Sequence, residues 1–237
     1  MTLAHDLGNV RFPAGDRPAA GEAPVRASWA GRCARELWYQ RHWPRPWQPT
    51  LEEQLRLEMG QRAHELVQAV LLRLWPEGTV EAEGLWWDGP GAFAPRLFLG
   101  AHADFLYGDE GETVAVEIKT VQAPWAVTRG PADHHWLQAE LVALACGAHR
   151  IVVLLVARSN GETASVERAA SSDIATAEYY RLLAALTSED FPPRIDERMA
   201  HWRCRGCPYA TECTFSTTPT TKMHLHHTRD NEDAPPF

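Results

Sequence analysis

Two acidic residues and a lysine are spaced so that they could share one face of a β-hairpin. Glu117 and Lys119 are two residues apart in an alternating apolar segment, so on a strand their side chains point the same way. Residues 108–112 favour a turn, which places Asp104 opposite Glu117. Because close carboxylates repel one another unless a cation intervenes, the spacing predicts a divalent-metal site. A cross-strand ion pair is the alternative.

Two further polar residues could join this group. His64 follows Gly60 by one helical turn, away from the main apolar stripe of its segment, and Gln138 lies on the predicted helix after the hairpin. A lone helical histidine is more often structural than a ligand. Of the 23 basic residues only Lys119 and Lys222 are lysines. Because the lysine amine is compact and its pKa is easily shifted, a role in chemistry is expected for Lys119.

Three of the five cysteines have metal-binding spacing. Cys204, Cys207 and Cys213 form a C-x2-C-x5-C segment, and Cys33 is the candidate for a fourth thiolate. Cys146 lies on an apolar helix and is expected to be a buried core residue. An odd cysteine count does not suggest a disulfide scaffold, so a metal site in a reducing compartment is favoured.

Apolar periodicity predicts the elements that carry these residues, and their order indicates a mixed α/β domain. In the second helix, Leu55, Met59, Leu66, Val70 and Leu74 mark one apolar stripe. Helices are expected over 28–42 (capped by Ser28), 51–75, 133–146 (ended by Gly147) and 173–187 (capped by Ser172 or Asp173), and strands over 84–88, 96–107, 113–119, 150–158 and 163–168.

Length and composition favour one soluble domain with appendages. The 237 residues carry a net charge of −8, which by itself argues mildly against a nucleic-acid partner. The longest apolar run, 151–157, is too short to span a membrane, and no signal peptide is recognised, so a cytoplasmic protein is expected. Residues 1–24 are interpreted as a flexible arm and 214–237 as a disordered tail.

The order of these residues resembles a known nuclease signature. Asp104 followed by Glu117-Ile118-Lys119 resembles the D…ExK motif of PD-(D/E)XK nucleases, and His64 and Gln138 resemble the RecB-like exonuclease branch. The resemblance runs over about residues 26–213. It implies a restriction-endonuclease-like fold, in which a mixed central sheet is flanked by helices, with residues 25–213 forming a single nuclease domain.

The resemblance also implies roles for these residues. His64, Asp104, Glu117 and the Ile118 carbonyl would hold Mg²⁺ or Mn²⁺, which activates water and neutralises phosphate charge. Lys119 would orient or help deprotonate the attacking water, and Gln138 would support the site. The branch usually has a tyrosine four residues after this glutamine, where this chain has Val142, and Gly100 lies one residue further from Asp104 than is usual. Both differences concern rate and substrate geometry more than the class of enzyme.

The early cysteine and the late cysteine triplet resemble a second feature of that branch. Cys33, Arg35 and Tyr39 match a C-x-R-x-x-x-Y segment, and the pattern is similar to the iron–sulfur clasp of CRISPR-associated Cas-four exonucleases and AddB-type helicase–nucleases. It implies a [4Fe–4S] cluster bound by Cys33, Cys204, Cys207 and Cys213, in a small helical module that joins 25–50 to 192–213. A zinc site is the alternative.

The resemblance implies a metal-dependent exonuclease acting on single-stranded DNA ends, with 5′→3′ polarity. Arginines interleaved with aromatic residues suit stacking and backbone contacts with single-stranded DNA. The candidate DNA-binding residues are Arg35, Arg41, Trp43, Trp47, Arg203 and Arg205. The alternative is a DNA-binding adaptor whose nuclease activity depends on a helicase, recombination or CRISPR-adaptation partner. A homo-oligomer is compatible with the family, and a phage or a CRISPR-bearing prokaryote would fit as its source.

Overall fold

The computed structural model describes residues 25–45, 49–87, 99–195 and 202–215, and side chains are not described in 81–87 or at positions 202, 205 and 215. The chain divides into two compact units, 1–195 and 196–237, which are described separately. The expected arm over 1–24 lies outside the described residues, as does the expected tail apart from residues 214 and 215.

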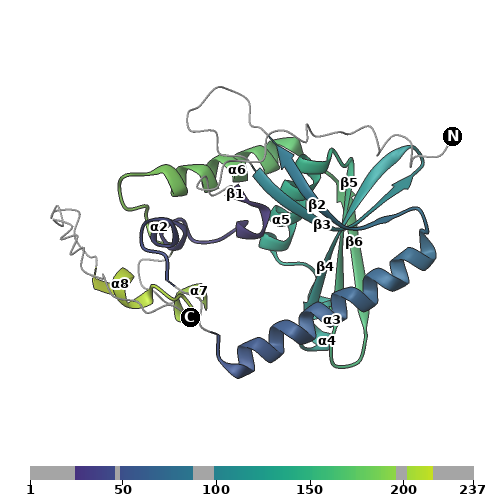
Figure 1. The fold of residues 1–237 in the computed structure, drawn as a ribbon, viewed down its shortest axis with the longest axis horizontal. Helices are drawn as coiled ribbons and strands as arrows, with labels where there is room; N and C mark the ends of the chain where they lie inside the picture. Colours follow the sequence, from purple (N-terminus) through teal and green to yellow (C-terminus); the bar gives the residue numbers. More distant parts are fainter. Residues whose placement is uncertain (1–24, 46–48, 88–98, 196–201, 216–237) are drawn as a thin grey trace, which may run out of the picture. The chain divides into compact units, whose positions relative to one another are not determined.

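The first unit is a sheet with helices on its two faces (Figure 1). Its strands are β1 (Val25–Arg26), β2 (Thr79–Trp87), β3 (Leu99–Asp109), β4 (Glu112–Val121), β5 (Arg150–Ala157) and β6 (Thr163–Ala169). Its helices are the 3-10 helix η1 (Ala27–Trp29), α2 (Ala34–His42), α3 (Leu51–Leu74), α4 (Pro124–Arg129), α5 (Asp133–Cys146) and α6 (Ser172–Thr187). The second unit contains α7 (Trp202–Arg205) and α8 (Ala210–Phe215).

The described strands form one mixed sheet in the order β1-β3-β4-β5-β6, with β2 also paired to β3. The β3–β4 hairpin and the β5–β6 pair are antiparallel, whereas β4 and β5 are parallel and are joined through α4 and α5. This is the βαβ crossover that a parallel pair requires. The expected mixed α/β fold with a central sheet flanked by helices is therefore confirmed.

Apolar side chains form separate clusters on the two faces of the sheet. Leu106 of β3 and Ala115 of β4 belong to the cluster that contains α5 and α6. Ile118 of β4 belongs to the other cluster, together with Leu71 of α3. Because alternate residues of a strand face opposite ways, the odd-numbered positions of β4 that follow Ala115 point toward α5. The alternation predicted for the hairpin is therefore present.

Helix α3 forms over nearly the predicted range, but its buried face differs from the predicted stripe. Thr50 and Glu53 form a capping box at its start. All five residues of the stripe, Leu55 to Leu74, are exposed. The buried residues of α3 are Gln68 and Leu71, which lie on the same side as His64. The reason is that β3 and β4 supply the apolar surface, and α3 meets it through a narrow, mixed face.

The first predicted helix begins later than the sequence indicated. Residues 25–26 pair with β3 as β1, and a 3-10 turn with Gly31 in the left-handed region (φ +66°) follows. Helix α2 therefore starts after Cys33, which is its N-cap, and Ser28 caps nothing. Ser171, rather than Ser172 or Asp173, caps α6 by accepting a hydrogen bond from the Ile174 amide.

Other element boundaries shift by less. β2 is longer than the expected strand over 84–88, and α4 was not anticipated because six residues show no helical periodicity. Helix α5 has the predicted bounds, and Gly147 ends it in the left-handed conformation (φ +67°). Among the described residues, no helix is both long and apolar enough to cross a membrane.

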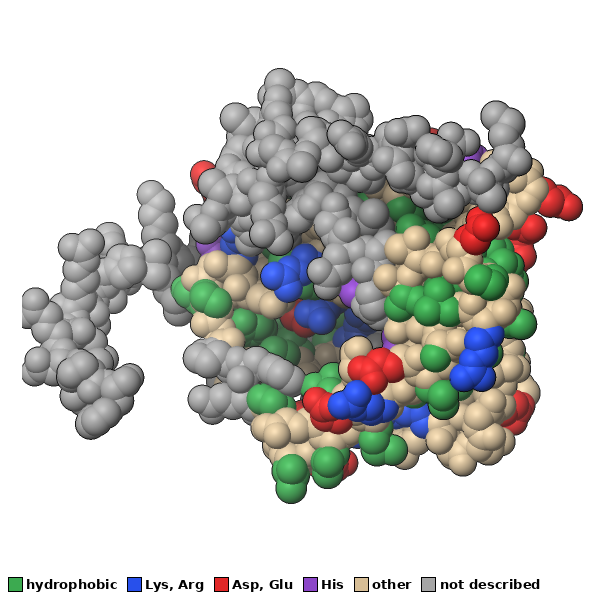
Figure 2. Space-filling model, turned by 45° about the vertical axis from the view of Figure 1, so that its right-hand side comes forward, with side chains coloured by type: hydrophobic (Ala, Val, Ile, Leu, Met, Phe, Trp, Pro, Cys, Tyr) green, Lys and Arg blue, Asp and Glu red, His purple; other side chains and the backbone are tan. Residues whose placement is uncertain are grey.

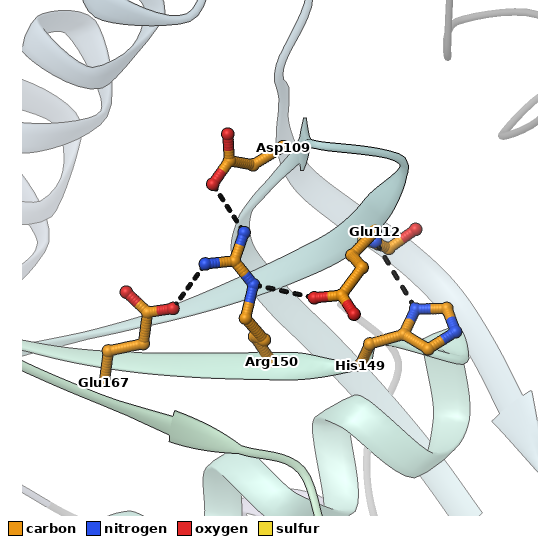
Figure 3. A network of polar contacts seen from close by, with 6 residues as sticks. Asp109, Glu112, His149, Arg150 and Glu167 are labelled. Atoms are coloured by element: carbon orange, nitrogen blue, oxygen red, sulfur yellow. Dashed lines mark hydrogen bonds and ion pairs between the residues drawn. The ribbon is translucent and has the colours of Figure 1, made fainter.

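One arginine of β5 forms ion pairs with residues of three other strands at the hairpin end of the sheet (Figure 3). Arg150, the first residue of β5, forms ion pairs with Asp109 at 2.5 Å, Glu112 at 2.9 Å and Glu167 at 2.6 Å. These carboxylates belong to β3, β4 and β6. The planar guanidinium can donate in several directions at once, so it fixes the strand ends relative to one another.

Candidate active site

The β3–β4 hairpin brings the two predicted carboxylates together. Phe105 pairs with Val116, and the same register continued by one residue places Asp104 beside Glu117. The Ile118 amide donates a hydrogen bond of 2.6 Å to Asp104 Oδ2, which holds the aspartate against β4. The turn centred on Glu110 and Gly111 sets this register, because a shift of one residue would reverse the faces of every side chain.

Lys119 connects the hairpin to helix α5. Its Nζ lies 2.5 Å from Glu117 Oε1 and donates a hydrogen bond of 3.0 Å to Gln138 Oε1. Glu117 is almost fully buried, whereas the Lys119 side chain is 22% exposed. The amine can therefore reach solvent or a substrate while it stays anchored by the other two side chains.

His64 approaches the carboxylates from helix α3. Its Nδ1 lies 3.8 Å from Asp104 Oδ1, so the imidazole faces the oxygen that the Ile118 amide leaves open. One turn earlier, Gly60 lies against β4, where a Cβ would sit 3.7 Å from Thr120 Oγ1. The structure thus gathers His64, Asp104 and Glu117 from three different elements, α3, β3 and β4.

Gln68 belongs to the same arrangement and was missed from the sequence. It is buried, and its Nε2 donates a hydrogen bond of 3.0 Å to the Asp104 carbonyl oxygen. Its position one turn after His64 was the available signal, because residues four apart share one face of a helix. Gln68 therefore attaches the His64-bearing turn of α3 to the main chain of Asp104.

Burial raises the pKa values of both carboxyl groups. Burial and the nearby Asp104 raise the pKa of Glu117 to about 7, although Lys119 opposes this by stabilising the charge. Burial also raises the pKa of Asp104, while His64 and the Ile118 amide work against it. The site therefore holds acidic groups in surroundings that disfavour their charge.

The donor set fits a divalent cation. Glu117 Oε2 is buried with no hydrogen-bond partner, Glu117 Oε1 faces Lys119, and Asp104 Oδ1 faces His64. An orphaned buried carboxylate oxygen is costly unless a cation or another donor neutralises it. Carboxylate oxygens with an imidazole nitrogen suit Mg²⁺ or Mn²⁺. Within the described ranges, no group of three or more His, Cys, Asp or Glu residues meets the geometry of a preformed metal site.

The predicted cysteine ligands lie in both units. Cys33 precedes α2 in the first unit, where its carbonyl oxygen accepts a hydrogen bond from the Leu37 amide. In the second unit, the Cys207 amide donates to the Cys204 carbonyl oxygen at 3.3 Å, and Cys213 is buried in α8. Their common site stays a prediction from spacing. Cys146 is a buried core residue as expected, and burial raises its pKa to about 11.

The predicted DNA-binding residues have different surroundings. Arg35 Nε donates to the Pro192 carbonyl oxygen at 2.7 Å, so this guanidinium secures the chain after α6. Trp43 is 37% exposed and belongs to an aromatic cluster with Trp38 and Phe191. The remaining candidates are Arg41, which is exposed, Arg203 in α7, Arg205, whose side chain is not described, and Trp47, which lies outside the described residues.

Charged side chains of both signs come together on the face drawn in Figure 2. Basic, acidic and histidine side chains are visible near the middle of that view, with apolar side chains beside them. The chain is acidic as a whole, with a net charge of −8. Local placement of cations therefore matters more than total charge for any contact with an anionic ligand.

Comparison with solved structures gives a fold match to SSO0001 and weaker matches to an alkaline exonuclease. The crystal structure of SSO0001 superposes with a TM-score of 0.59 at 14% identity, covering 92% of this chain and 96% of that one. The alkaline exonuclease LHK-Exo from Laribacter hongkongensis gives a TM-score of 0.44 at 14% identity, and its complex with dAMP gives 0.47 at 16% identity. Both cover 69% of this chain and 86% of theirs.

Comparison by sequence gives the family. Among curated proteins, none matches this sequence. The family description "PD-(D/E)XK nuclease superfamily" matches residues 10–214, which is most of the chain. The matched region contains the whole sheet and the hairpin that carries Asp104, Glu117 and Lys119. The chain therefore belongs to the PD-(D/E)XK nuclease superfamily.

Proposed function

We propose that this chain is a metal-dependent exonuclease that hydrolyses phosphodiester bonds at single-stranded DNA ends, in the 5′→3′ direction. One observation carries the proposal: Asp104 and Glu117 lie on adjacent strands, and a buried Glu117 oxygen has no hydrogen-bond partner beside Lys119. Superfamily membership supports hydrolysis of nucleic acid. Polarity and the preference for single strands rest on the resemblance to RecB-like exonucleases.

His64, Asp104, Glu117 and the Ile118 carbonyl would hold Mg²⁺ or Mn²⁺, which lowers the pKa of bound water and neutralises phosphate charge. Lys119 would direct its Nζ at the attacking water, because Glu117 and Gln138 both fix the amine. Gln138 thereby controls where the lysine points. Asp104 keeps one oxygen available since the Ile118 amide engages the other.

End-labelled DNA tests this proposal. Single-stranded and duplex substrates labelled at either end are incubated with Mg²⁺, Mn²⁺ or EDTA, and the products are sized over time. We expect cleavage that requires metal and is lost in Lys119→Ala, Asp104→Ala and Glu117→Ala, a loss of at least about 10²-fold. Lys222→Ala, which removes the other lysine, is the matched control and should keep wild-type activity.

The products decide the details. Release of the label from the 5′ end as the shortest product supports 5′→3′ polarity, whereas release from the 3′ end contradicts it. Wild-type rates in Lys119→Ala would show that the site assignment is wrong. Circular single-stranded DNA has no ends, so its cleavage would show that the protein is an endonuclease rather than the proposed exonuclease.

A second candidate is a DNA-binding adaptor whose nuclease activity needs a partner, such as a helicase, recombination protein or CRISPR-adaptation protein. Val142 favours it, because this residue is buried in the core where related exonucleases carry a tyrosine. The chain therefore has no phenol hydroxyl at this position of α5. DNA binding without cleavage by metal-loaded wild-type protein would support the adaptor, and robust cleavage by the isolated chain would exclude it.

The four cysteines Cys33, Cys204, Cys207 and Cys213 are proposed to bind a [4Fe–4S] cluster, with zinc as the alternative. Support comes from their spacing and from the resemblance to iron–sulfur exonucleases. Anaerobically purified protein should contain iron and acid-labile sulfide, and Cys207→Ser should lose both. Cys146→Ser, a buried core position, is the matched control and should retain them. Zinc without sulfide would identify the alternative.

A further inference from the structure

Helix α3 presents a long apolar surface away from the sheet. We call the residues Leu51, Leu55, Met59, Leu66, Val70 and Leu74 the outer stripe of α3; their exposed fractions lie between 44% and 71%. The sheet contacts the opposite side, through Leu71 and Gln68. Figure 1 shows α3 along the margin of the first unit. Contiguous exposed apolar surface of this kind marks an interaction site.

The outer stripe is symmetric along the helix. Leu51 and Leu74, Leu55 and Val70, and Met59 and Leu66 lie at equal distances from a point between Arg62 and Ala63. A two-fold axis through that point would place every apolar residue of one helix against an apolar residue of an antiparallel copy. Such self-complementarity is what an isologous interface requires, since residue i meets j and j meets i.

One pair of oppositely charged residues follows the same symmetry. Glu52 and Arg73 are equidistant from the centre, so antiparallel pairing would set Glu52 beside Arg73 of the second copy, and the reverse. Both are exposed; the Glu52 side chain is 83% exposed and lies 3.4 Å from Arg56 of its own helix, an exposed pair that leaves Glu52 accessible to a second copy. Antiparallel helices also bring opposite ends of their dipoles together. Parallel pairing would instead place like charges side by side.

Two arginines of α3 would face alanines in the antiparallel pair. The position opposite Arg56 is Ala69, and the position opposite Arg62 is Ala63. Arg62 already donates to Glu65 at 2.7 Å, which turns its charge along the helix surface. Small residues opposite large ones allow the two helices to approach to about 8–10 Å between axes.

We propose that a second copy of this chain docks antiparallel on the outer stripe of α3 and forms a two-fold dimer. The contact would run along the helix, which is about 36 Å long for its 24 residues. The sheet-facing residues His64 and Gln68 stay on the opposite side of α3. The proposed dimer does not depend on nuclease activity, and the symmetric pattern of apolar and charged residues selects a second copy over any other occupant.

Sedimentation velocity and light scattering of the full chain across a concentration series test the dimer. Wild type should shift from monomer to dimer as concentration rises. Leu66→Glu, which faces Met59 of the other copy, should weaken the dimer at least about 100-fold, because it buries a charge in an apolar contact. Leu57→Glu is the matched control: Leu57 is exposed on α3 but lies off the outer stripe, so the dimer should persist.

Charge reversal tests the antiparallel register. Glu52→Arg and Arg73→Glu should each weaken the dimer, by roughly threefold to thirtyfold over its two symmetric pairs. The double variant Glu52→Arg/Arg73→Glu should recover most of that loss, because it restores both pairs. Within one monomer Glu52 and Arg73 are about six helical turns apart and cannot contact each other. A recovery of dimer affinity in the double variant therefore cannot come from a contact inside one monomer.

Three outcomes would overturn the proposed dimer. The first is a monomer at every soluble concentration, as would follow if residues 1–24 or another protein covered the stripe. The second is a dimer that survives Leu66→Glu, which places the interface elsewhere. The third is a double charge variant that dimerises no more tightly than either single variant. Circular dichroism of each variant checks folding, and the charge-reversal series still decides the register if Leu66→Glu does not fold.

Discussion

Glu117 is the residue at which the requirements of chemistry and stability conflict. Its carboxyl is buried beside Asp104, which raises its pKa to about 7, and one of its oxygens has no hydrogen-bond donor. Lys119 offsets only part of this penalty. The fold maintains this group at a cost in stability, as is common where binding or catalytic groups are placed in protein interiors.

Replacing the carboxyl of Glu117 by an amide should stabilise the metal-free protein. Its folded pKa lies above the ordinary value of 4.5, so its contribution to stability is full below about pH 4.5 and is lost as pH rises through about 7. In EDTA at pH 8, Glu117→Gln should therefore melt higher than wild type. Roughly 2–4 °C is expected for each 1 kcal/mol gained.

Thermal unfolding followed by circular dichroism at pH 5 and pH 8 measures the effect. The difference between Glu117→Gln and wild type should be larger at pH 8. An equal difference at both pH values would show that charge is not its cause. Glu58→Gln, an exposed position on α3, is the control and should show no such dependence.

Gln68 is expected to act as a positioning residue for the proposed metal site. Gln68→Leu keeps the side-chain volume but removes the donor to the Asp104 carbonyl, which frees the turn of α3 that carries His64. If the proposed nuclease activity holds, the Mn²⁺ concentration for half-maximal cleavage should rise roughly tenfold. Gln61→Leu, exposed on the same helix, should leave it unchanged, and an unaltered requirement in Gln68→Leu would refute this role.

At the scale of elements, buried carboxylates connect helices to distant parts of the chain. Glu140 of α5 accepts hydrogen bonds from Arg168 of β6 and from the Ser171 amide, at 2.8 and 2.7 Å. Glu178 of α6 accepts from the Gly31 amide at 2.7 Å, two residues before Cys33 in the sequence. These contacts hold α5, α6 and the segment before α2 against one face of the sheet.

Glu140→Gln should destabilise the fold by about 2 kcal/mol, because an amide cannot accept from both donors without presenting its own NH₂ to one of them. This expected loss of stability is smaller than for a fully buried ion pair, because the Arg168 side chain is 37% exposed. Urea denaturation followed by tryptophan fluorescence measures the change. A midpoint equal to that of wild type would mean that the pair does not hold α5 in place.

At the scale of the whole molecule, the first unit contains all of the described carboxylate site. Residues His64, Asp104, Glu117, Lys119 and Gln138 all lie before residue 195, whereas three of the four proposed cluster cysteines lie after it. A truncation after residue 195 would therefore keep the residues of the proposed hydrolytic site and remove three of the four proposed cluster ligands.

A chain ending at Ile195 should keep the sheet and lose the iron. Its far-ultraviolet circular dichroism should show the helices and strands of the first unit, with one cooperative unfolding transition, while iron analysis of the anaerobic preparation should give none. Loss of cooperative unfolding would show that the second unit is needed for folding. Retained iron would place the cluster outside the proposed four cysteines.

Local sequence determined the hairpin and several elements around it. The turn at Glu110 and Gly111 fixed the register that opposes Asp104 and Glu117, and Gly147 ended α5 where expected. These features depend on residues near one another in the chain, through strand alternation and backbone conformation. The carboxylates and Lys119 could therefore be placed on one face before any tertiary contact was known.

Only the tertiary structure decided which side of each helix is buried. The apolar stripe of α3 faces outward because β3 and β4 meet the helix through the side that carries His64, Gln68 and Leu71. The start of α2 moved to Ala34 because residues 25–26 pair with a strand more than seventy positions later. Which helix face is buried depends on residues far away in the sequence. Apolar periodicity indicates only that a helix has an apolar face; it does not indicate whether the core or a partner covers that face.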